Sequence, residues 1–144
     1  MPSESLISAT IIVCESVLTE QNGVPSAIRL IDILTLASGN PIAHFFTITN
    51  LHAVSLDPEK HRLAIKMRRP VLGGGWETVA ETTEREFVYS HRLSLTAPGA
   101  CLLTTEFNVN VDMLGGLGTF YLEAWLEGKM VAHTPLTLRR PDQK

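Results

Sequence analysis

The sequence predicts an all-β protein, a single-domain antiparallel β-sandwich of immunoglobulin-like or jelly-roll-like type with eight or nine strands. Nearly every segment alternates apolar and polar residues with a period of two, as strands do. No segment sustains the i, i+3, i+4, i+7 apolar spacing of an amphipathic helix over three turns. Turn residues separate the segments at short intervals, which is typical of sandwiches and barrels. Because 144 residues is the size of one domain, we expect residues 1–144 to form one.

The first half of the chain predicts three strands. Residues 9–14 alternate and lead to Asn22-Gly23, a strong hairpin signal. "SAIRLIDILTL" (26–36) continues as one strand, on which Asp32 shares a side with two leucines, and Pro41 after Gly39-Asn40 marks the next strand. A buried acid without a partner is costly, so Asp32 requires a structural partner or an edge position. One side of the third strand carries three residues: His44, Phe46 and Ile48.

Further strands follow in the middle of the chain. A turn at Pro58 leads into "RLAIKMRR" (62–69), and three glycines (73–75) form a tip before a short strand. Residues 81–86 are polar enough for a short helical turn. Alternation then returns with Phe87, Tyr89, His91, Leu93 and Leu95 on one side. After the Pro98-Gly99 turn, the odd-numbered residues of a strand over 101–111 face one way.

The last segment, from Gly118 to Arg140, predicts a hairpin. A three-residue loop (127–129) pairs Leu126 with Met130, Ala124 with Ala132 and Phe120 with Leu136, so that all of these residues lie on one apolar face. The outer face then pairs Trp125 with Val131, Glu123 with His133 and Tyr121 with Pro135. Aromatic residues are enriched at interfaces, so this outer strip is the candidate contact surface. It consists of Tyr121, Glu123, Trp125, Val131, His133 and Pro135.

The two ends of the chain resemble a family of small bacterial β-sandwich proteins of unknown function. In residues 9–36 the similarity lies in a strand, an Asn-Gly turn and a second strand. In residues 107–138 it lies in an Asn-x-Asn strand and a Glu-Gly hairpin. The chain departs from the family pattern at Val24, where lysine is common, and at Leu117-Gly118, which replaces Pro-Gly. The resemblance implies the sandwich fold and no catalytic residue.

Composition limits the partners and the compartment. A net charge of -3 argues against a nucleic-acid binder, which usually carries a basic stripe. No stretch approaches the roughly 20 apolar residues of a membrane helix, and the N-terminus lacks signal-peptide features. Two cysteines, Cys14 and Cys101, form no disulfide framework. We therefore expect a cytoplasmic protein with reduced thiols that binds neither nucleic acid nor membrane.

Motifs for catalysis and for metal binding are weak. The five histidines lack the short paired spacing of zinc ligands, and we expect His44 and His91 on apolar strand faces. The carboxylate of Glu15, next to Cys14, would raise the pKa of the Cys14 thiol and so make the thiol less reactive. The glycine runs lack the Lys-Ser/Thr sequel of phosphate loops. We expect no catalytic residue, no metal and no cofactor, so the protein is not expected to be an enzyme.

Two functions from different classes remain. The first is a non-catalytic protein-interaction or assembly module, whose outer hairpin face meets a second copy of the chain as a homodimer or another protein. The alternative is a small-molecule or carbohydrate-binding module. In that case Asn108 and Asn110 line a polar surface together with Trp76 or Trp125, although a solvated outer sheet face is the favoured explanation of the two asparagines, because alternation alone produces it.

Overall fold

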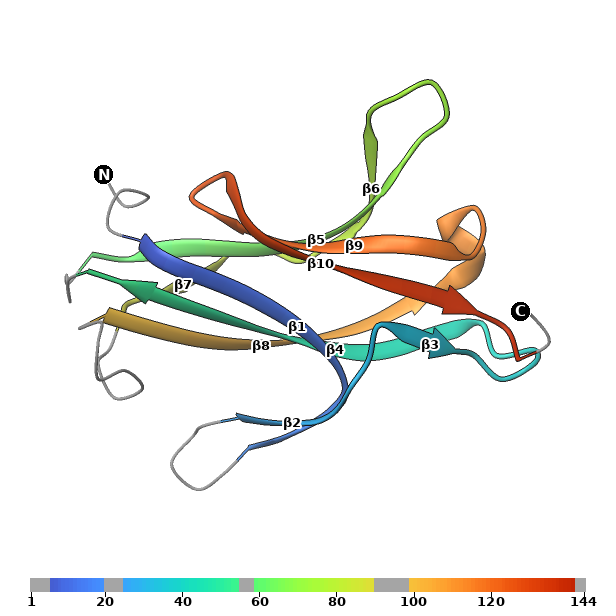
Figure 1. Ribbon diagram of the computed structural model, residues 1–144, viewed down its shortest axis with the longest axis horizontal. Helices are drawn as coiled ribbons and strands as arrows, with labels where there is room; N and C mark the ends of the chain where they lie inside the picture. Colours follow the sequence, from blue (N-terminus) through green and yellow to red (C-terminus); the bar gives the residue numbers. More distant parts are fainter. Residues whose placement is uncertain (1–5, 20–24, 55–58, 90–98, 142–144) are drawn as a thin grey trace.

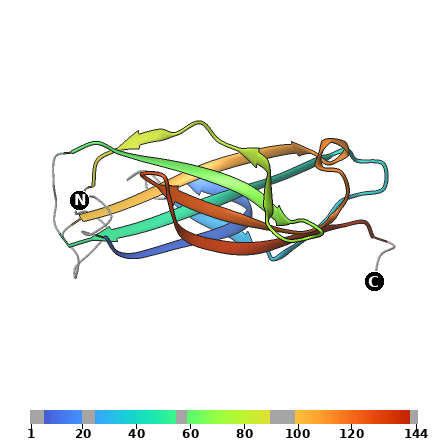
Figure 2. The ribbon, with the colours of Figure 1, turned by 90° about the horizontal axis from the view of Figure 1, so that it is seen from above.

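The protein folds into two β-sheets that pack face to face, as seen in the computed structural model (Figures 1 and 2). The structure describes residues 6–19, 25–54, 59–89 and 99–141. The four-stranded sheet has the order β2-β1-β4-β8, and the six-stranded sheet has the order β3-β10-β9-β5-β6 with β7 also paired to β5. The strands are β1 (Leu6–Thr19), β2 (Pro25–Leu30), β3 (Ile33–Thr35), β4 (Ile42–Ala53), β5 (His61–Pro70), β6 (Trp76–Glu81), β7 (Arg85–Phe87), β8 (Gly99–Asn110), β9 (Gly118–Leu126) and β10 (Lys129–Arg139).

The all-β sandwich predicted from the alternation is confirmed, with ten strands in the described residues in place of eight or nine. The difference arises in residues 26–36, which form two strands in different sheets. Arg29 adopts a left-handed backbone (φ 60) and the chain bends near Asp32, so β2 stays in one sheet and β3 joins the other. β3 runs parallel to β10, whereas the other pairings are antiparallel.

Two other segments differ from expectation. Residues 82–84 have no regular structure and no helical turn, because the chain passes in extended form from β6 to β7. The strand over 101–111 ends one residue early at Asn110, whose side-chain oxygen accepts a hydrogen bond from the Asp112 N–H at 2.9 Å. That bond caps a short 3₁₀ turn, η2 (Val111–Leu114). Some predicted features lie outside the described residues. They are the turn signals at Asn22-Gly23, Pro58 and Pro98 and the strand residues His91, Leu93 and Leu95.

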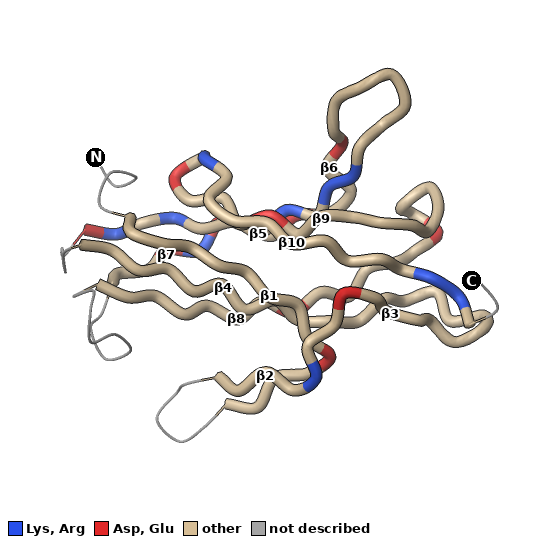
Figure 3. The backbone as a smooth tube through the Cα atoms, in the orientation of Figure 1, with Lys and Arg blue, Asp and Glu red and all other residues tan. Residues whose placement is uncertain are grey.

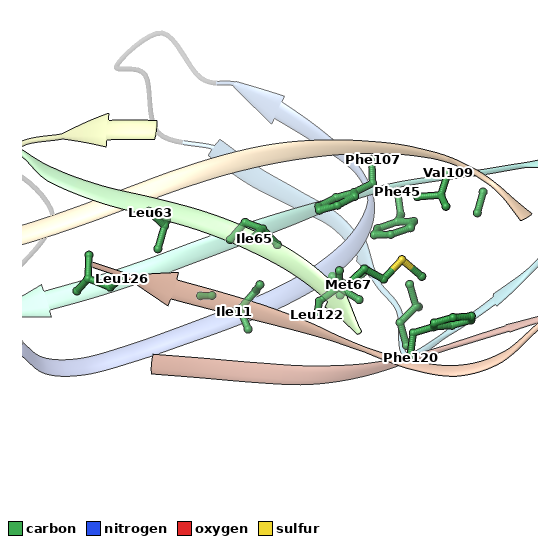
Figure 4. Close-up of a cluster of buried hydrophobic side chains, with 14 of the residues drawn as sticks. Ile11, Phe45, Leu63, Ile65, Met67, Phe107, Val109, Phe120, Leu122 and Leu126 are labelled. Carbon is green, nitrogen blue, oxygen red and sulfur yellow. The ribbon is translucent and has the colours of Figure 1, made fainter. Parts of the chain in front are cut away.

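The core lies between the two sheets and takes alternate residues from each strand (Figure 4). On β4 the odd-numbered residues face inward, and Phe45 is fully buried against Phe107 of β8 with stacked rings 5.1 Å apart. The predicted inner face of β9 is confirmed. Its four members are all buried: Phe120, Leu122, Ala124 and Leu126.

The last hairpin has a two-residue loop, so the predicted three-residue loop is wrong. Glu127 and Gly128 are both left-handed (φ 51 and 79), as in a type I′ turn, and Met130 therefore lies opposite Trp125. A bulge between Met130 and Ala132 then shifts the register by one residue. The predicted pairs beyond the bulge are confirmed: Ala124 with Ala132, Glu123 with His133, Tyr121 with Pro135 and Phe120 with Leu136.

Glu127 ties this turn to β5. Its Oε1 lies 3.1 Å from Nδ1 of the fully buried His61 and accepts a hydrogen bond from the Arg62 N–H at 3.2 Å. Its own N–H donates to the Arg62 carbonyl at 3.0 Å. These bonds hold the turn at one end of the outer face of the six-stranded sheet.

Candidate binding cleft on the six-stranded sheet

A cleft of about 400 Å³ opens on the outer face of the six-stranded sheet. Figure 1 shows the β5–β6 hairpin and the β9–β10 turn rising on this same side. Pairing of β5 with β9 places Arg68 opposite Tyr121 and Lys66 opposite Glu123. Side chains from four strands therefore converge. The cleft is lined by Arg68, Trp76, Tyr121, Glu123, Trp125, Met130 and His133.

The polar part of the cleft is a connected set of hydrogen bonds around Glu123. This carboxylate points out of the sandwich, yet only 5% of the residue is exposed because its neighbours cover it. Its Oε1 accepts from Nη1 of Arg68 at 3.2 Å and from Nε1 of Trp125 at 2.9 Å. A buried carboxylate needs such partners, so the pair orders the side chains of the cleft.

The apolar part of the cleft is aromatic. Trp76 and Tyr121 meet edge to face with ring centres 5.3 Å apart, and His133 lies 6.1 Å from Tyr121 on the other side. Trp76 is 48% exposed, so its ring is available to a ligand. Both tryptophans of the chain lie in this cleft.

The cations of β5 lie against these rings. Lys66 Nζ sits 4.0 Å from the ring centre of Trp125, and the Arg68 guanidinium lies 5.8 Å from Trp125 and 6.0 Å from Trp76. Figure 3 shows acidic and basic residues close together on this face near β5 and β9. Arg68 of the lining and the neighbouring Lys66 thus place two cations beside the one carboxylate of the lining, Glu123.

The structure brings together four of the six residues predicted as a contact surface. Tyr121, Glu123, Trp125 and His133 line the cleft. Val131 lies at the β10 bulge and packs against the core, half-buried. Pro135 is exposed opposite Tyr121 and lies outside the lining.

Two lining residues, Arg68 and Met130, were missed by sequence reasoning, and Trp76 was named only in the alternative carbohydrate-binding surface together with the two asparagines. The alternation of residues 62–69 places Lys66 and Arg68 on one side of a strand, but the pairing of that strand with β9 is non-local and leaves no local signal. Met130 was expected in the core because of the three-residue loop; the shorter turn places it opposite Trp125, and it is 46% exposed.

Other predicted features do not form a site with the cleft. Asn108 and Asn110 belong to β8 in the four-stranded sheet, and neither is part of the cleft lining that holds Trp76 and Trp125. Asp32 is exposed, so the expected burial cost does not arise. His44 lies on the exposed face of β4, not on an apolar face, with Nε2 2.7 Å from Oε2 of Glu106.

The described part of the chain holds no group of three His, Cys, Asp or Glu side chains arranged to bind a metal ion. Within the same residues no helix has the length and hydrophobicity needed to cross a bilayer.

Both cysteines are buried free thiols in strands separated by β4. Burial raises the pKa of Cys14, and it raises the pKa of Cys101 from 9.0 to about 12, a rise that the positive charge of Arg85 partly offsets. The thiolate is the reactive form. We therefore expect iodoacetamide at pH 8 to label neither cysteine in the folded protein and both in denaturant, as read by mass spectrometry. Equal labelling of both states would contradict this burial.

The same pKa of Cys101 predicts a loss of stability in alkali. Its folded pKa lies above the unfolded value near 9, so its contribution is intact below pH 9 and is lost as the pH rises towards 12. Urea unfolding at several pH values between these limits should show a steeper decline for the wild type than for Cys101→Ala. Parallel curves would contradict the prediction.

Comparisons with known proteins give distant likenesses only. No protein-family model and no curated protein matches the chain. Among solved structures, it is similar to part of the alkylpurine DNA glycosylase AlkC of Pseudomonas fluorescens, bound to DNA containing an abasic site analogue, with a TM-score of 0.46 and 12% identity. That match covers 92% of this chain and 30% of the glycosylase chain. An immunoglobulin-like protein of Pseudomonas aeruginosa matches with a TM-score of 0.37 and 14% identity, over 92% of this chain and 97% of that one.

The first of these likenesses corrects one expectation. Nucleic acid was excluded as a partner on net charge, yet most of this chain matches part of a DNA-bound protein. Net charge averages over a whole surface, whereas binding depends on the local field. β5 alone carries Arg62, Lys66 and Arg68 at even-numbered positions of its outer face. The exclusion of nucleic acid is therefore withdrawn, and at these TM-scores the likenesses carry no argument for a function.

Proposed function

We propose that this protein is a non-catalytic binding module that holds a sugar ring in the aromatic cleft. The observation that carries the proposal is the concave lining itself, in which Trp76, Tyr121 and Trp125 surround a hydrogen-bonded carboxylate. Small-ligand sites are concave and mostly apolar, with a few placed polar groups. A sugar matches that division, because one face of its ring is apolar and its rim carries hydroxyl groups.

The charges of the cleft favour a neutral or acidic sugar. Arg68 and Lys66 already lie near the faces of the tryptophans, so a cationic ligand would meet like charge there. Glu123 can accept further hydrogen bonds from hydroxyl groups, since a carboxylate has about four acceptor sites. A carboxyl group on the sugar would be drawn to Arg68 and Lys66.

Tryptophan fluorescence tests this function directly, because both tryptophans of the chain line the cleft. We expect a saturable change in emission with at least one probe among glucose, galactose, glucuronate and galacturonate. Trp76→Ala should weaken binding about tenfold by removing the exposed ring, as read from the remaining tryptophan.

Leu72→Ala at the β5–β6 tip is the matched control. This leucine is fully exposed and lies outside the cleft lining, so sugar affinity should not change. Absence of saturable binding to these probes and to a broad glycan array would overturn the proposal.

A second candidate is the protein-interaction module expected from the sequence, acting through the same face. It is favoured by exposed apolar side chains on this side of the molecule: Trp76 and Met130 of the cleft, which are 48% and 46% exposed, and the fully exposed Leu72 of the β5–β6 tip. Peptides selected by phage display should then depend on both Leu72 and Trp76. Since the sugar site does not use Leu72, the Leu72→Ala variant separates the two functions.

We also propose a family and a cellular compartment for this protein. The strand and turn signals at residues 9–36 and 107–138 support membership of the family of small bacterial β-sandwich proteins. Two free, buried cysteines support a cytoplasmic location, where disulfides are rare.

A further inference from the structure

The geometry points to a second binding site on the other sheet: we propose that the free edge of β8 binds an extended, basic peptide as an added strand. β8 is the last strand of the four-stranded sheet, and within the described residues it pairs with β4 alone. This site lies apart from the aromatic cleft and does not depend on the sugar-binding function.

The direction of the backbone groups of β8 follows from two hydrogen bonds. In an antiparallel strand the N–H and C=O of one residue point to the same side, and successive residues alternate. The Val111 N–H donates to the carbonyl of Pro41, next to β4, at 2.8 Å, so odd-numbered residues face β4. The Thr104 carbonyl accepts from Nη1 of Arg85 at 2.7 Å, so even-numbered residues face away. The exposed even-numbered residues between these points are Glu106, Asn108 and Asn110.

The pairing of β1 leads independently to the same result. The Ile31 N–H donates to the Val13 carbonyl at 3.0 Å, so Val13 faces β2 and its neighbour Cys14 faces β4. Cys14 lies opposite Phe46, which in turn lies opposite Glu106. Phe46 therefore directs its backbone groups towards β1, and Glu106 directs its own towards the free edge.

A groove of about 320 Å³ runs along this edge. Residues 79–82 form one side of the groove and residues 106–110 the other, and Figure 2 shows β6 and β7 on the same side of the molecule as β8. Met113, which is 84% exposed, and Leu114 line it from η2. Arg85 already donates a hydrogen bond to the Thr104 carbonyl, so the open edge begins only after Thr104. Exposed strand edges are templates for an incoming strand.

The lining selects the chemistry of the peptide. Glu81 and Glu106 belong to the groove lining, which contains no lysine or arginine among the described residues. The same lining carries Val79 and Met113 as apolar contacts. Alternate side chains of an added strand point to opposite faces. An apolar residue can therefore enter the groove, while the next residue, Lys or Arg, meets Glu106 on the exposed face of the four-stranded sheet, where the carboxylate also lies 2.7 Å from Nε2 of His44. Nucleic acid does not fit, because its phosphates would face these carboxylates.

Fluorescence anisotropy with a labelled, end-blocked six-residue peptide of alternating Lys and Val tests the proposal. We expect saturable binding to the wild-type chain. Methylation of alternate backbone nitrogens of the peptide, which removes the donors but keeps the side chains, should weaken binding at least about tenfold. A Glu-Val peptide of the same length should not bind.

Variants locate the site. Asn108→Pro should weaken peptide binding at least about tenfold, because it removes an N–H that faces the free edge and leaves the bonds to β4 in place. The double variant Glu81→Lys with Glu106→Lys should also weaken peptide binding, because it replaces two negative charges by positive ones. Both positions are exposed, so this variant tests the site even where Asn108→Pro fails to fold. Leu18→Ala, at an exposed position of β1 outside the groove lining, should leave the peptide affinity unchanged.

Three results would overturn the proposal. The first is that binding of the Lys-Val peptide does not saturate at millimolar concentration. The second is that the N-methylated peptide binds as tightly as the unmodified one, and the third is that a folded Asn108→Pro variant binds the peptide as tightly as the wild-type chain. Sugar binding by the same variants separates the two sites, because loss of one activity should leave the other intact.

Discussion

Replacing Arg68 by alanine is expected to lower the free energy of unfolding by about 3 kcal/mol. The reason is Glu123, which is 5% exposed and accepts a hydrogen bond from the Arg68 guanidinium at 3.2 Å. Removal of one partner of a buried ion pair leaves an uncompensated charge in a poorly hydrated place. Urea unfolding at neutral pH, followed by circular dichroism, measures the loss.

The matched control is the double variant Arg68→Met with Glu123→Gln, in which no buried charge remains. It should recover most of the stability, since buried ion pairs replaced by uncharged side chains are often neutral. Trp125 Nε1, which donates to Glu123 at 2.9 Å, can still donate to the side-chain amide oxygen that this variant places there. A loss below about 0.5 kcal/mol in Arg68→Ala would show that water replaces the guanidinium, and the cleft would then not be ordered by this pair.

Replacing Phe45 by alanine is expected to cost about 3–5 kcal/mol of unfolding free energy. Phe45 is fully buried between the sheets and stacks on Phe107 with an angle of 8° between the rings, so its loss leaves a cavity beside an unpaired ring. Guanidinium unfolding gives the value.

Phe46→Ala provides the comparison within the same strand. Phe46 is half-buried on the outer face and contacts His44 edge to face at 5.2 Å, so its truncation should cost about 1 kcal/mol. Equal losses at the two neighbouring positions would mean that the inward and outward faces of β4 are not those described here.

How much of the fold could be predicted depends on how local each signal is. The alternation of β9 identifies its buried face without knowledge of any partner strand, and the structure confirms those four residues. The division of residues 26–36 could not be predicted, because it depends on a left-handed Arg29, a conformation that a non-glycine residue seldom adopts. The alternation in that segment continues through the bend and hides it.

The candidate site was predictable only in part, for the same reason. Tyr121, Glu123, Trp125 and His133 belong to one hairpin, whose pairing follows from a short turn. Arg68 and Trp76 reach the cleft only because β5 pairs with β9, and that contact spans more than fifty residues. Met130 depends on a bulge that restores the register after a two-residue loop, and either loop length keeps Ala124 opposite Ala132.

The two proposed sites use different chemistry on different sheets. The cleft on the six-stranded sheet is aromatic and has two cations beside its one carboxylate, whereas the groove along β8 has two carboxylates and backbone groups directed outward. A neutral or acidic sugar fits the first and a basic strand fits the second. One chain with both sites would connect a sugar-bearing ligand to a protein partner without any chemical step.

The most direct test of the sugar-binding cleft is the ¹H–¹⁵N spectrum of the two indole groups during sugar titration. The chain has only two tryptophans, and both line the cleft, so both indole signals report on this site. We predict that glucuronate, or another sugar bound in the fluorescence assay, shifts both signals along one saturable curve. Unchanged indole signals in the presence of a sugar that binds the protein would contradict the assignment of the cleft as its site.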